Sequence, residues 1–373
     1  MPSLANIARL GVKEFRSLKA DPVLSVLILY VFTLAIYSVA TGVQFEVRNA
    51  AVAVADEDRS HLSRRIAGAI QPPYFSPADE IAPAEITPAM DAGRYVFVIE
   101  IPPDFEKDVL RGHRPSVLID IDATAMAQAG NGASYLQKIV AQEVAGYLSQ
   151  GADAGQAVRV VTRARFNPNL QSMWFTAVMQ VINNITILSV ILTGAALIRE
   201  REHGTLEHLL VMPVSPAEVM LAKIWANGLV IATAALLSLL LVVEGLLGVP
   251  VHGSLALFIA GAVLYQFSVT ALGILLATFT RSMAQFGLLI IPVIVIMNLL
   301  SGSTTPLESM PVWLQNVTQL MPSTHFVAFA QAVLYRGAGL SIVWPELVWI
   351  AGIDVAVFAI ALSRFRTTML SAR

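Results

Sequence analysis

Two acidic residues, Glu244 and Asp354, stand inside long apolar segments of this chain of 373 residues. Ionisable side chains at membrane depth commonly bind or relay ions in transporters. A relay needs several such groups, and the interiors of these apolar segments contain no Lys, Arg or His. The pattern favours an energy source outside these segments, and an ion-coupled secondary transporter stays as an alternative.

Motifs for hydrolytic or metal chemistry are missing from the sequence. It has no GxxxxGK[ST] loop to hold ATP phosphates, no GxSxG or HExxH motif, and no cysteine for thiol catalysis or disulfides. The six His residues are scattered, so we expect no metal site and no enzyme, with a membrane-embedded enzyme as the second alternative. A net charge of −2 gives no reason to expect nucleic-acid binding.

The segment 199–223 has the length and pattern of a docking element. It opens with the charged run Arg199 to Glu202, and Thr205 and Ser215 can each cap a following helix. Leu206, Leu209 and Leu210 fall on one helical face, with Glu207 and His208 on another. A plain connection between two helices needs only about 2–8 residues. The extra patterned sequence favours docking to a soluble partner over a simple turn.

Six apolar stretches must position these residues. The chain is 56% hydrophobic and 13% charged, with a mean hydropathy of +0.67, whereas soluble domains carry about 25% charged residues. About 20 apolar residues cross a bilayer as a helix. The expected spans lie at about 22–42, 173–198, 224–248, 254–279, 284–301 and 346–363. The fold class is therefore an α-helical integral membrane protein with about six transmembrane helices.

The distribution of positive charge orients these spans. If the N-terminus is cytoplasmic, the inside segments carry Arg9, Lys13, Arg16, Lys19, Arg199, Arg201, Lys223, Arg281, Arg364, Arg366 and Arg373. The two short outside loops carry only Arg336, so the positive-inside rule places both termini in the cytoplasm. Ser38-Val39-Ala40 resembles a signal-peptidase site. The preceding apolar run of about 19 residues exceeds the usual 7–15 of a signal peptide, so we expect an uncleaved anchor.

Residues 43–172 form the one segment with the pattern of a soluble domain. Strands are expected at 50–56, 95–101 and 117–121, helices at 61–70, 103–111 and 134–149, and a proline-rich loop at 72–88. We therefore expect an α/β domain inserted outside the membrane between the first and second spans. Residues 1–21 form a basic amphipathic helix that is expected to lie at the cytoplasmic interface, against membrane lipids.

Two further groups of residues are candidates for the transport path. Polar residues in the middle of spans either bond neighbouring helices or face a pathway, and the candidates of this kind are Gln180, Asn183, Asn184 and Asn298. The outer loop 302–345 contains a proline-bounded apolar helix between Pro311 and Pro322. Its Trp313 can serve as an interfacial anchor, and Ser303, Thr304 and Trp313 are a possible outer gate.

The run LIREREHGTLEHLLVMPVSPAEVMLAK at 197–223 resembles the signature loop of ABC-2 type transporter permeases. RFNPNLQSMWF (165–175) and LSGSTTPLESMPVWLQNVTQLMPSTHF (300–326) look like further pieces of that family in the same order. DEDRSHLSRRI (56–66), IPPDFEKDVLRGHRP (101–115) and DATAMAQAG (122–130) resemble the external domain of its long, multidrug-exporter-like members. The polar Ser303-Thr304-Thr305 departs from the bulkier apolar residues usual there.

This resemblance implies a function for each region. Residues 1–21 correspond to a connecting helix, and the loop 199–223 to a coupling helix that touches an ATP-binding subunit. The coupling positions carried over are Glu202, Gly204, Thr205, Glu207, His208 and Pro213.

The same resemblance implies the setting in which the chain works. It would be the permease subunit of an ATP-binding cassette exporter in a bacterial inner membrane. It would move an amphiphilic or drug-like substrate out of the cytoplasm or inner leaflet, and a separate subunit would hold the ATP and Mg. A second permease copy or a paralogue is expected, since six spans are few for a complete path, and a membrane-fusion adaptor is a further implied partner.

Overall fold

The computed structural model describes residues 3–42, 49–122, 126–149, 171–204 and 213–371. The chain divides into two compact units, residues 1–42 with 173–373 and residues 43–172. The first is entirely helical in its described part, and the second combines a sheet with helices.

The α/β unit is built on a four-stranded sheet of order β2-β1-β3-β4. Strands β1 (Val52–Asp56), β2 (Asp79–Glu80) and β3 (Phe97–Ile101) are parallel, and β4 (Leu118–Ile121) pairs antiparallel with β3. Parallel neighbours need crossover connections, which α4 (His61–Ala69) and α5 (Ile86–Asp91) provide together with the short turn η1 (Pro83–Glu85). Helices α6 (Phe105–Leu110) and α7 (Met126–Ser149) complete the unit.

Alternation along the strands gives this unit two apolar layers. Val52 and Val54 of β1 pack with Phe97 and Ile99 of β3 in a core that also takes up side chains of α4, α6 and α7. The intervening Ala53, Ala55 and Val98 face the other side, where Ile86 of α5 covers them. Because both faces of the sheet are covered, the central strands read as nearly continuous apolar runs.

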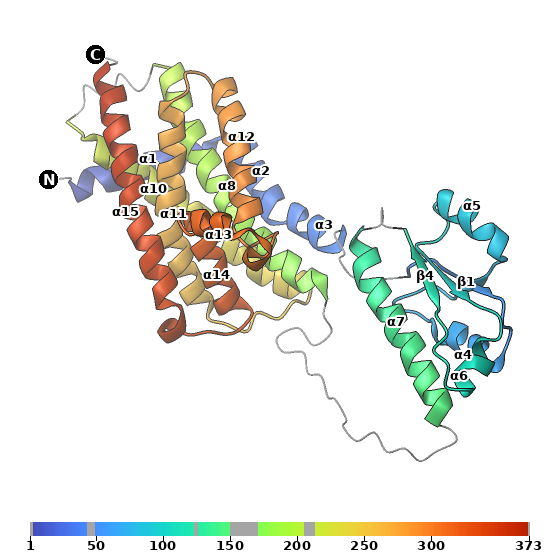
Figure 1. Cartoon of the computed structure of the whole chain (residues 1–373). Coiled ribbons are helices and arrows are strands. Elements are labelled where there is room, and N and C mark those ends of the chain that lie inside the picture. Colours follow the sequence, from blue (N-terminus) through green and yellow to red (C-terminus); the bar gives the residue numbers. More distant parts are fainter. Residues whose placement is uncertain (1–2, 43–48, 123–125, 150–170, 205–212, 372–373) are drawn as a thin grey trace. The chain divides into compact units, whose positions relative to one another are not determined.

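Six helical stretches of the described chain are long and apolar enough to cross a bilayer. The first consists of α2 (Pro22–Phe32) and α3 (Leu34–Gly42), which Thr33 separates. The others are α8 (Ser172–Glu202), α10 (Pro216–Leu237) continued by the π-helix η2 (Ser238–Leu246), α11 (Leu255–Thr278), α12 (Met283–Leu300) and α15 (Leu340–Ser371). These helices form the bundle in Figure 1. The number of spans expected from the sequence is confirmed.

Helix α8 is the centre of the bundle. In its most apolar window 72% of residues are buried, against 17% for α12 and for α15. Polar side chains join it to three neighbours: Asn184 donates to the carbonyl of Val31 in α2 at 2.7 Å, the hydroxyls of Thr186 and Tyr265 in α11 lie 2.8 Å apart, and Asn227 of α10 donates to Thr193 at 2.9 Å. Such bonds hold membrane helices in register.

Several boundaries differ from the sequence expectation. Residues 203–215 separate α8 from α10, so both helices extend into the segment 199–223. The segment 72–88, expected to be a loop, contains β2, η1 and the start of α5. The outer segment 302–345 holds η3 (Leu307–Ser309), α13 (Val312–Thr318), α14 (Pro322–Leu334) and the first turns of α15. Helix α14 is almost wholly buried, so the expectation of a mainly interfacial loop is wrong there.

Candidate functional site

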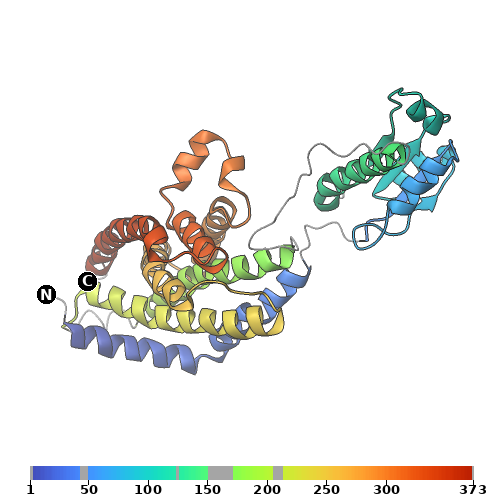
Figure 2. The same ribbon diagram turned by 90° about the horizontal axis from the view of Figure 1, so that it is seen from below.

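The N-terminal helix α1 (Leu4–Ala20) lies along α10 (Figure 2). Gly11 allows this close approach, because a Cβ atom there would lie only 2.1 Å from the ring of Trp225. The Trp225 indole N–H in turn donates to the carbonyl of Ile7 at 3.1 Å. A small residue facing a large ring brings the two helix backbones together. Helix α1 is therefore packed on the bundle and does more than rest on the lipid surface.

The start of α10 is bonded to the start of α1 through one carboxylate. Ser215 caps α10 with Pro216 at the first helical position, as the sequence predicts. Glu218 completes a capping box with Ser215. The same Glu218 accepts from the backbone N–H of Ser3 at 2.6 Å and from the Asn6 amide at 3.3 Å. One side chain thus caps α10 and anchors the first turn of α1.

A buried ion cluster joins α1, α8 and α10. Lys223 of α10 is 1% exposed, and its ammonium lies 3.0 Å from Glu14 of α1 and 3.0 Å from Glu200 of α8. Lys13 of α1 adds a longer contact of 3.9 Å to Glu200. We call Lys13, Glu14, Glu200 and Lys223 the ion cluster.

The charges of the ion cluster depend on one another, because a buried charge is tolerated only when its partners are in place. Burial alone raises the pKa of Glu14, but attraction and hydrogen bonding from Lys223 outweigh that effect and leave this pKa below its ordinary value. Glu14 is therefore a carboxylate at neutral pH. A displacement of α1 would separate it from Lys223, so the cluster makes α1 move together with α8 and α10.

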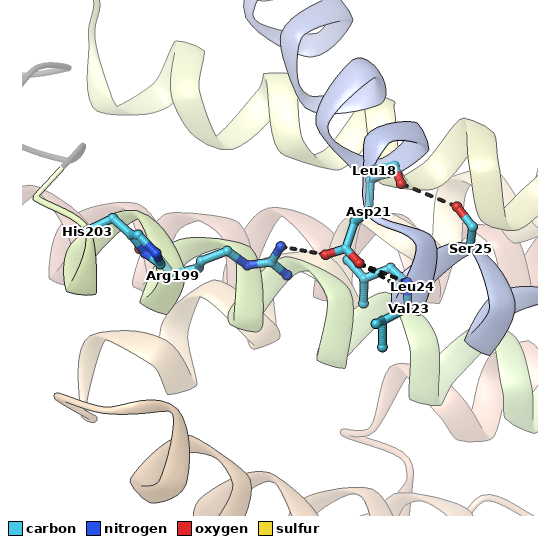
Figure 3. A network of polar contacts seen from close by, with 7 residues as sticks. All are labelled: Leu18, Asp21, Val23, Leu24, Ser25, Arg199 and His203. Carbon is cyan, nitrogen blue, oxygen red and sulfur yellow. Dashed lines mark hydrogen bonds and ion pairs between the residues drawn. The ribbon is translucent and has the colours of Figure 1, made fainter.

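An elbow between α1 and α2 is fixed by Asp21 (Figure 3). Its carboxylate caps α2 by accepting from the N–H groups of Val23 and Leu24, both at 3.1 Å, and it also lies 2.7 Å from the guanidinium of Arg199 in α8. The N–H of Leu24 and the Arg199 charge hold the pKa of Asp21 below its usual range. Helix α1 is thus tied to α8 at a second point.

The end of α8 is also fastened to the helices beside it. The Arg201 guanidinium donates to the carbonyl of Thr280, just after α11, at 2.5 Å, and Glu202 accepts from the N–H of Met283 at the start of α12 at 2.9 Å. Gly204 then ends α8 with a φ of +66°, a backbone conformation that favours glycine. The end of α8 is thus bonded to its neighbours at the point where the segment leading to α10 begins.

A cavity of about 280 Å³ opens beside α1 and the end of α8. Its lining combines charged side chains of α1 and α8 with the apolar Leu18, Leu24, Leu192 and Ala196. The cavity therefore offers both polar and apolar contacts.

The coupling positions named from the sequence fall into two groups. Glu202, Gly204 and Pro213 lie in the described chain, at the two ends of the loop. Thr205, Glu207 and His208 lie outside the described residues. The coupling role of all six positions stays a prediction.

The candidate pathway residues differ in burial and in hydrogen-bond partners. Gln180 donates to Asn184, which bonds α2, so this pair serves helix packing. Asn183 and Asn298 are half-buried. Among the gate candidates, Ser303 is buried and donates to the carbonyl of Asn298, whereas Thr304 and Trp313 are exposed. The gate candidates thus differ in burial, and their role as a gate stays a prediction.

The two intramembrane acids also differ in their surroundings. Glu244 is half-buried in the π-helix η2. Asp354 of α15 is buried and accepts a hydrogen bond from the Ser268 hydroxyl of α11. Asp354 therefore has a hydrogen-bonding partner inside the bundle.

Sequence reasoning missed the ion cluster. In the sequence analysis, Lys223 appears only as one of the positive charges expected on the cytoplasmic side. One local signal was available: it follows VMLA and precedes IWA in the sequence, and a lysine in such apolar surroundings is rarely buried unless paired. Its partners Glu14 and Glu200 lie 209 and 23 positions away, and nothing in the local pattern identifies them.

Comparison with known proteins agrees with this architecture. The model of the ABC-2 family transporter protein matches residues 23–363. The chain is 49% identical over 370 residues, 99% of both chains, to the inner membrane transport permease YhhJ of Escherichia coli strain K12. It is 29% identical over 364 residues, 96% of this chain and 97% of the relative, to the probable multidrug ABC transporter permease YbhR of the same strain. The chain therefore belongs to the ABC-2 family and is a membrane permease of an ABC transporter.

Proposed function

We propose that this chain is the permease subunit of an ATP-driven exporter, and that α1 together with the loop 203–215 docks the ATP-binding subunit. The observation that carries the proposal is the ion cluster, with Lys223 held 3.0 Å from carboxylates of both α1 and α8. A force applied to α1 or to the start of α10 passes through these bonds to the central helix α8.

The proposed orientation places this end of the bundle in the cytoplasm. The ends of α8, α11 and α15 meet there, since Arg201 bonds Thr280 and the guanidinium of Arg364 lies 4.7 Å from the Phe279 ring centroid. The Lys and Arg residues of α1 belong to the same end, as the positive-inside rule requires of a cytoplasmic surface. The inner membrane is the proposed location, in line with the name of the relative YhhJ.

The proposed substrate is amphiphilic or drug-like. The cavity beside α1 offers charged groups and apolar side chains to one ligand, and the relative YbhR is named as a probable multidrug permease. We propose export from the cytoplasm or inner leaflet through a path shared with a second permease copy or a paralogue. The unit 43–172 would lie outside the membrane, where a membrane-fusion adaptor could meet it.

Co-purification tests the docking proposal. The tagged full-length permease is expressed with each ATP-binding cassette subunit of the host in turn, to find the one that it retains. Glu207→Arg and Gly204→Trp are then expected to reduce the retained ATPase by about tenfold or more, because reversed charge or added bulk at a buried interface costs well over 1.4 kcal/mol.

Glu57→Arg is the matched control, since it reverses an exposed charge in the α/β unit and should leave retention unchanged. Retention of the ATPase at the wild-type level by both loop variants would contradict the docking surface. Equal loss in the control would assign the effect to expression or folding of the permease.

A further inference from the structure

A buried histidine lies at the end of the bundle away from α1. His325 is in the first turn of α14 and only 4% of it is exposed. Its Nε2 lies 2.9 Å from the carbonyl oxygen of Gln319, just after α13, and its Nδ1 lies 2.7 Å from a carboxylate oxygen of Glu346 in α15. One imidazole ring therefore links three consecutive helices.

The number of protons in this arrangement follows from the two acceptors. A carbonyl oxygen can only accept, so Nε2 carries a hydrogen. A neutral imidazole would then present the lone pair of Nδ1 to an ionised carboxylate, which also can only accept. A distance of 2.7 Å between them requires one more proton, either on Nδ1 or on Glu346. The observed geometry therefore holds a proton that neutral histidine and ionised glutamate would lack.

The surroundings of the ring suit a bound proton. The Trp349 ring of α15 stacks on the imidazole at a centroid distance of 5.5 Å and an interplanar angle of 7°, and cations are attracted to such a face. The side chain of Glu346 is 33% exposed, so protons can exchange with water.

Other titratable groups on the helices packed around α14 are engaged elsewhere or lie apart. Asp354 bonds Ser268, the Tyr265 hydroxyl bonds Thr186, and the Tyr335 hydroxyl donates to the carbonyl of Phe175. Arg336 follows α14, and His252 precedes α11 with its side chain exposed. Glu346 is thus the titratable partner that contacts the ring among the described residues.

We propose that His325 and Glu346 form a proton-binding site, and that the bound proton latches the segment 301–339, including α13 and α14, onto α15. With the proton in place, the ring donates to Gln319 and is attracted to Glu346. When the proton leaves, a neutral ring keeps a hydrogen on only one nitrogen, so either Nδ1 faces Glu346 or Nε2 faces Gln319 as a second acceptor, and the latch opens. Proton binding would thereby control the segment.

Thiol accessibility tests the latch, and the chain contains no native cysteine. Ser323, two residues before His325, is 2% exposed, and its hydroxyl has no hydrogen-bond partner in the described chain. Ser323→Cys therefore removes no bond. The full-length variant in lipid nanodiscs is labelled with a maleimide at about pH 5.5 and about pH 8.5, on either side of ordinary imidazole titration.

The labelling rate is divided by that of Asn316→Cys, an exposed position on α13, which corrects for the reactivity of the thiol itself. The ratio should rise about tenfold or more at the higher pH, since a charge-assisted hydrogen bond is lost. Glu346→Gln should keep the ratio low at both pH values, because its amide N–H can donate to a neutral Nδ1. Glu346→Ala should make it high at both.

A ratio for Ser323→Cys that does not change with pH would overturn the proposal, as would a Glu346→Gln variant that opens at high pH like the parent. Both faces of a nanodisc are open to the reagent, so neither result depends on the orientation or on the docking proposal.

Discussion

The two ends of the helix bundle fasten their peripheral helices with different chemistry. At one end, Lys223 meets the carboxylates of Glu14 and Glu200 at 3.0 Å each. At the other, His325 meets a single carboxylate among the described residues, that of Glu346 at 2.7 Å. Helix α15 runs between the two ends. It carries Glu346 near its start and Arg364 near its end, and these two residues are about 27 Å apart at 1.5 Å per residue.

These different side chains predict a different response to pH at each end of the bundle. A lysine among carboxylates keeps its charge across the neutral range, so the ion cluster is a permanent joint that transmits movement. A histidine facing one carboxylate gains or loses its attraction with a single proton. The end proposed to dock the ATP-binding subunit is held by ion pairs at neutral pH. The end proposed to face outward is the one that we propose responds to pH.

Of the substitutions considered for the end near α1, removing Lys223 should lower the stability of the protein most. Lys223→Met leaves Glu14 and Glu200 as buried carboxylates without their main partner, and breaking a buried pair in this way costs about 3–5 kcal/mol. Heating the purified variant and following the monodisperse peak by size exclusion should show a large fall in Tm.

Lys19→Met is the matched control, since Lys19 is exposed on the same helix α1. Adding Glu14→Gln and Glu200→Gln to Lys223→Met should recover much of the loss, because the unpaired charges are then gone. A single variant as stable as the parent would mean that the cluster does not hold α1.

A smaller effect is expected from the contact between α1 and α10. Gly11→Ala places a methyl group about where the Trp225 ring lies, and overpacking of this kind costs about 1–3 kcal/mol. Gly287→Ala is the control, because a Cβ atom there meets nothing within 4 Å. Combining Gly11→Ala with Trp225→Ala should relieve the clash, and additive losses in the double variant would count against direct packing of Gly11 on Trp225.

The smallest effect should come from the elbow. Asp21→Ala removes the cap of α2, which costs about 1 kcal/mol, whereas Asp21→Ser keeps a capping oxygen and removes only the ion pair with Arg199. The pKa of Asp21 is lowered in the folded protein, so its stabilising effect is complete above the ordinary carboxyl range and is lost as the pH falls through the lowered value. The difference in Tm between parent and Asp21→Ala should therefore shrink in acid, and a constant difference would exclude a contribution from the charge.

Much of the membrane architecture follows from local sequence. An apolar run of span length predicts a crossing helix wherever it occurs, and the Ser215-Pro216 cap of α10 is a short-range signal that the structure confirms. Helix α14 could not be found in this way, because its 13 residues are too few for a span and too buried for a loop. Its burial depends on tertiary packing against α11 and α15, which the local pattern of these residues does not show.

The candidate sites were harder to predict for the same reason. Lys223 and His325 each stand alone in sequence, and a lone Lys or His carries no information about its partners. Glu14 and Glu346 come within 3.0 Å of them only after folding. By contrast, the loop 199–223 could be recognised because its charged run, caps and prolines are contiguous.

In the proposed orientation, the segment between α8 and α10 faces the cytoplasm, and the α/β unit lies on the opposite side of the membrane. The cysteine-free chain allows a direct measurement: single cysteines replace His208 in the loop or the exposed Arg114 in the α/β unit, and a membrane-impermeant maleimide is added to intact spheroplasts. We predict rapid labelling of Arg114→Cys and labelling of His208→Cys only after the membrane is permeabilised. Labelling of both positions from the same side of an intact membrane would contradict the account.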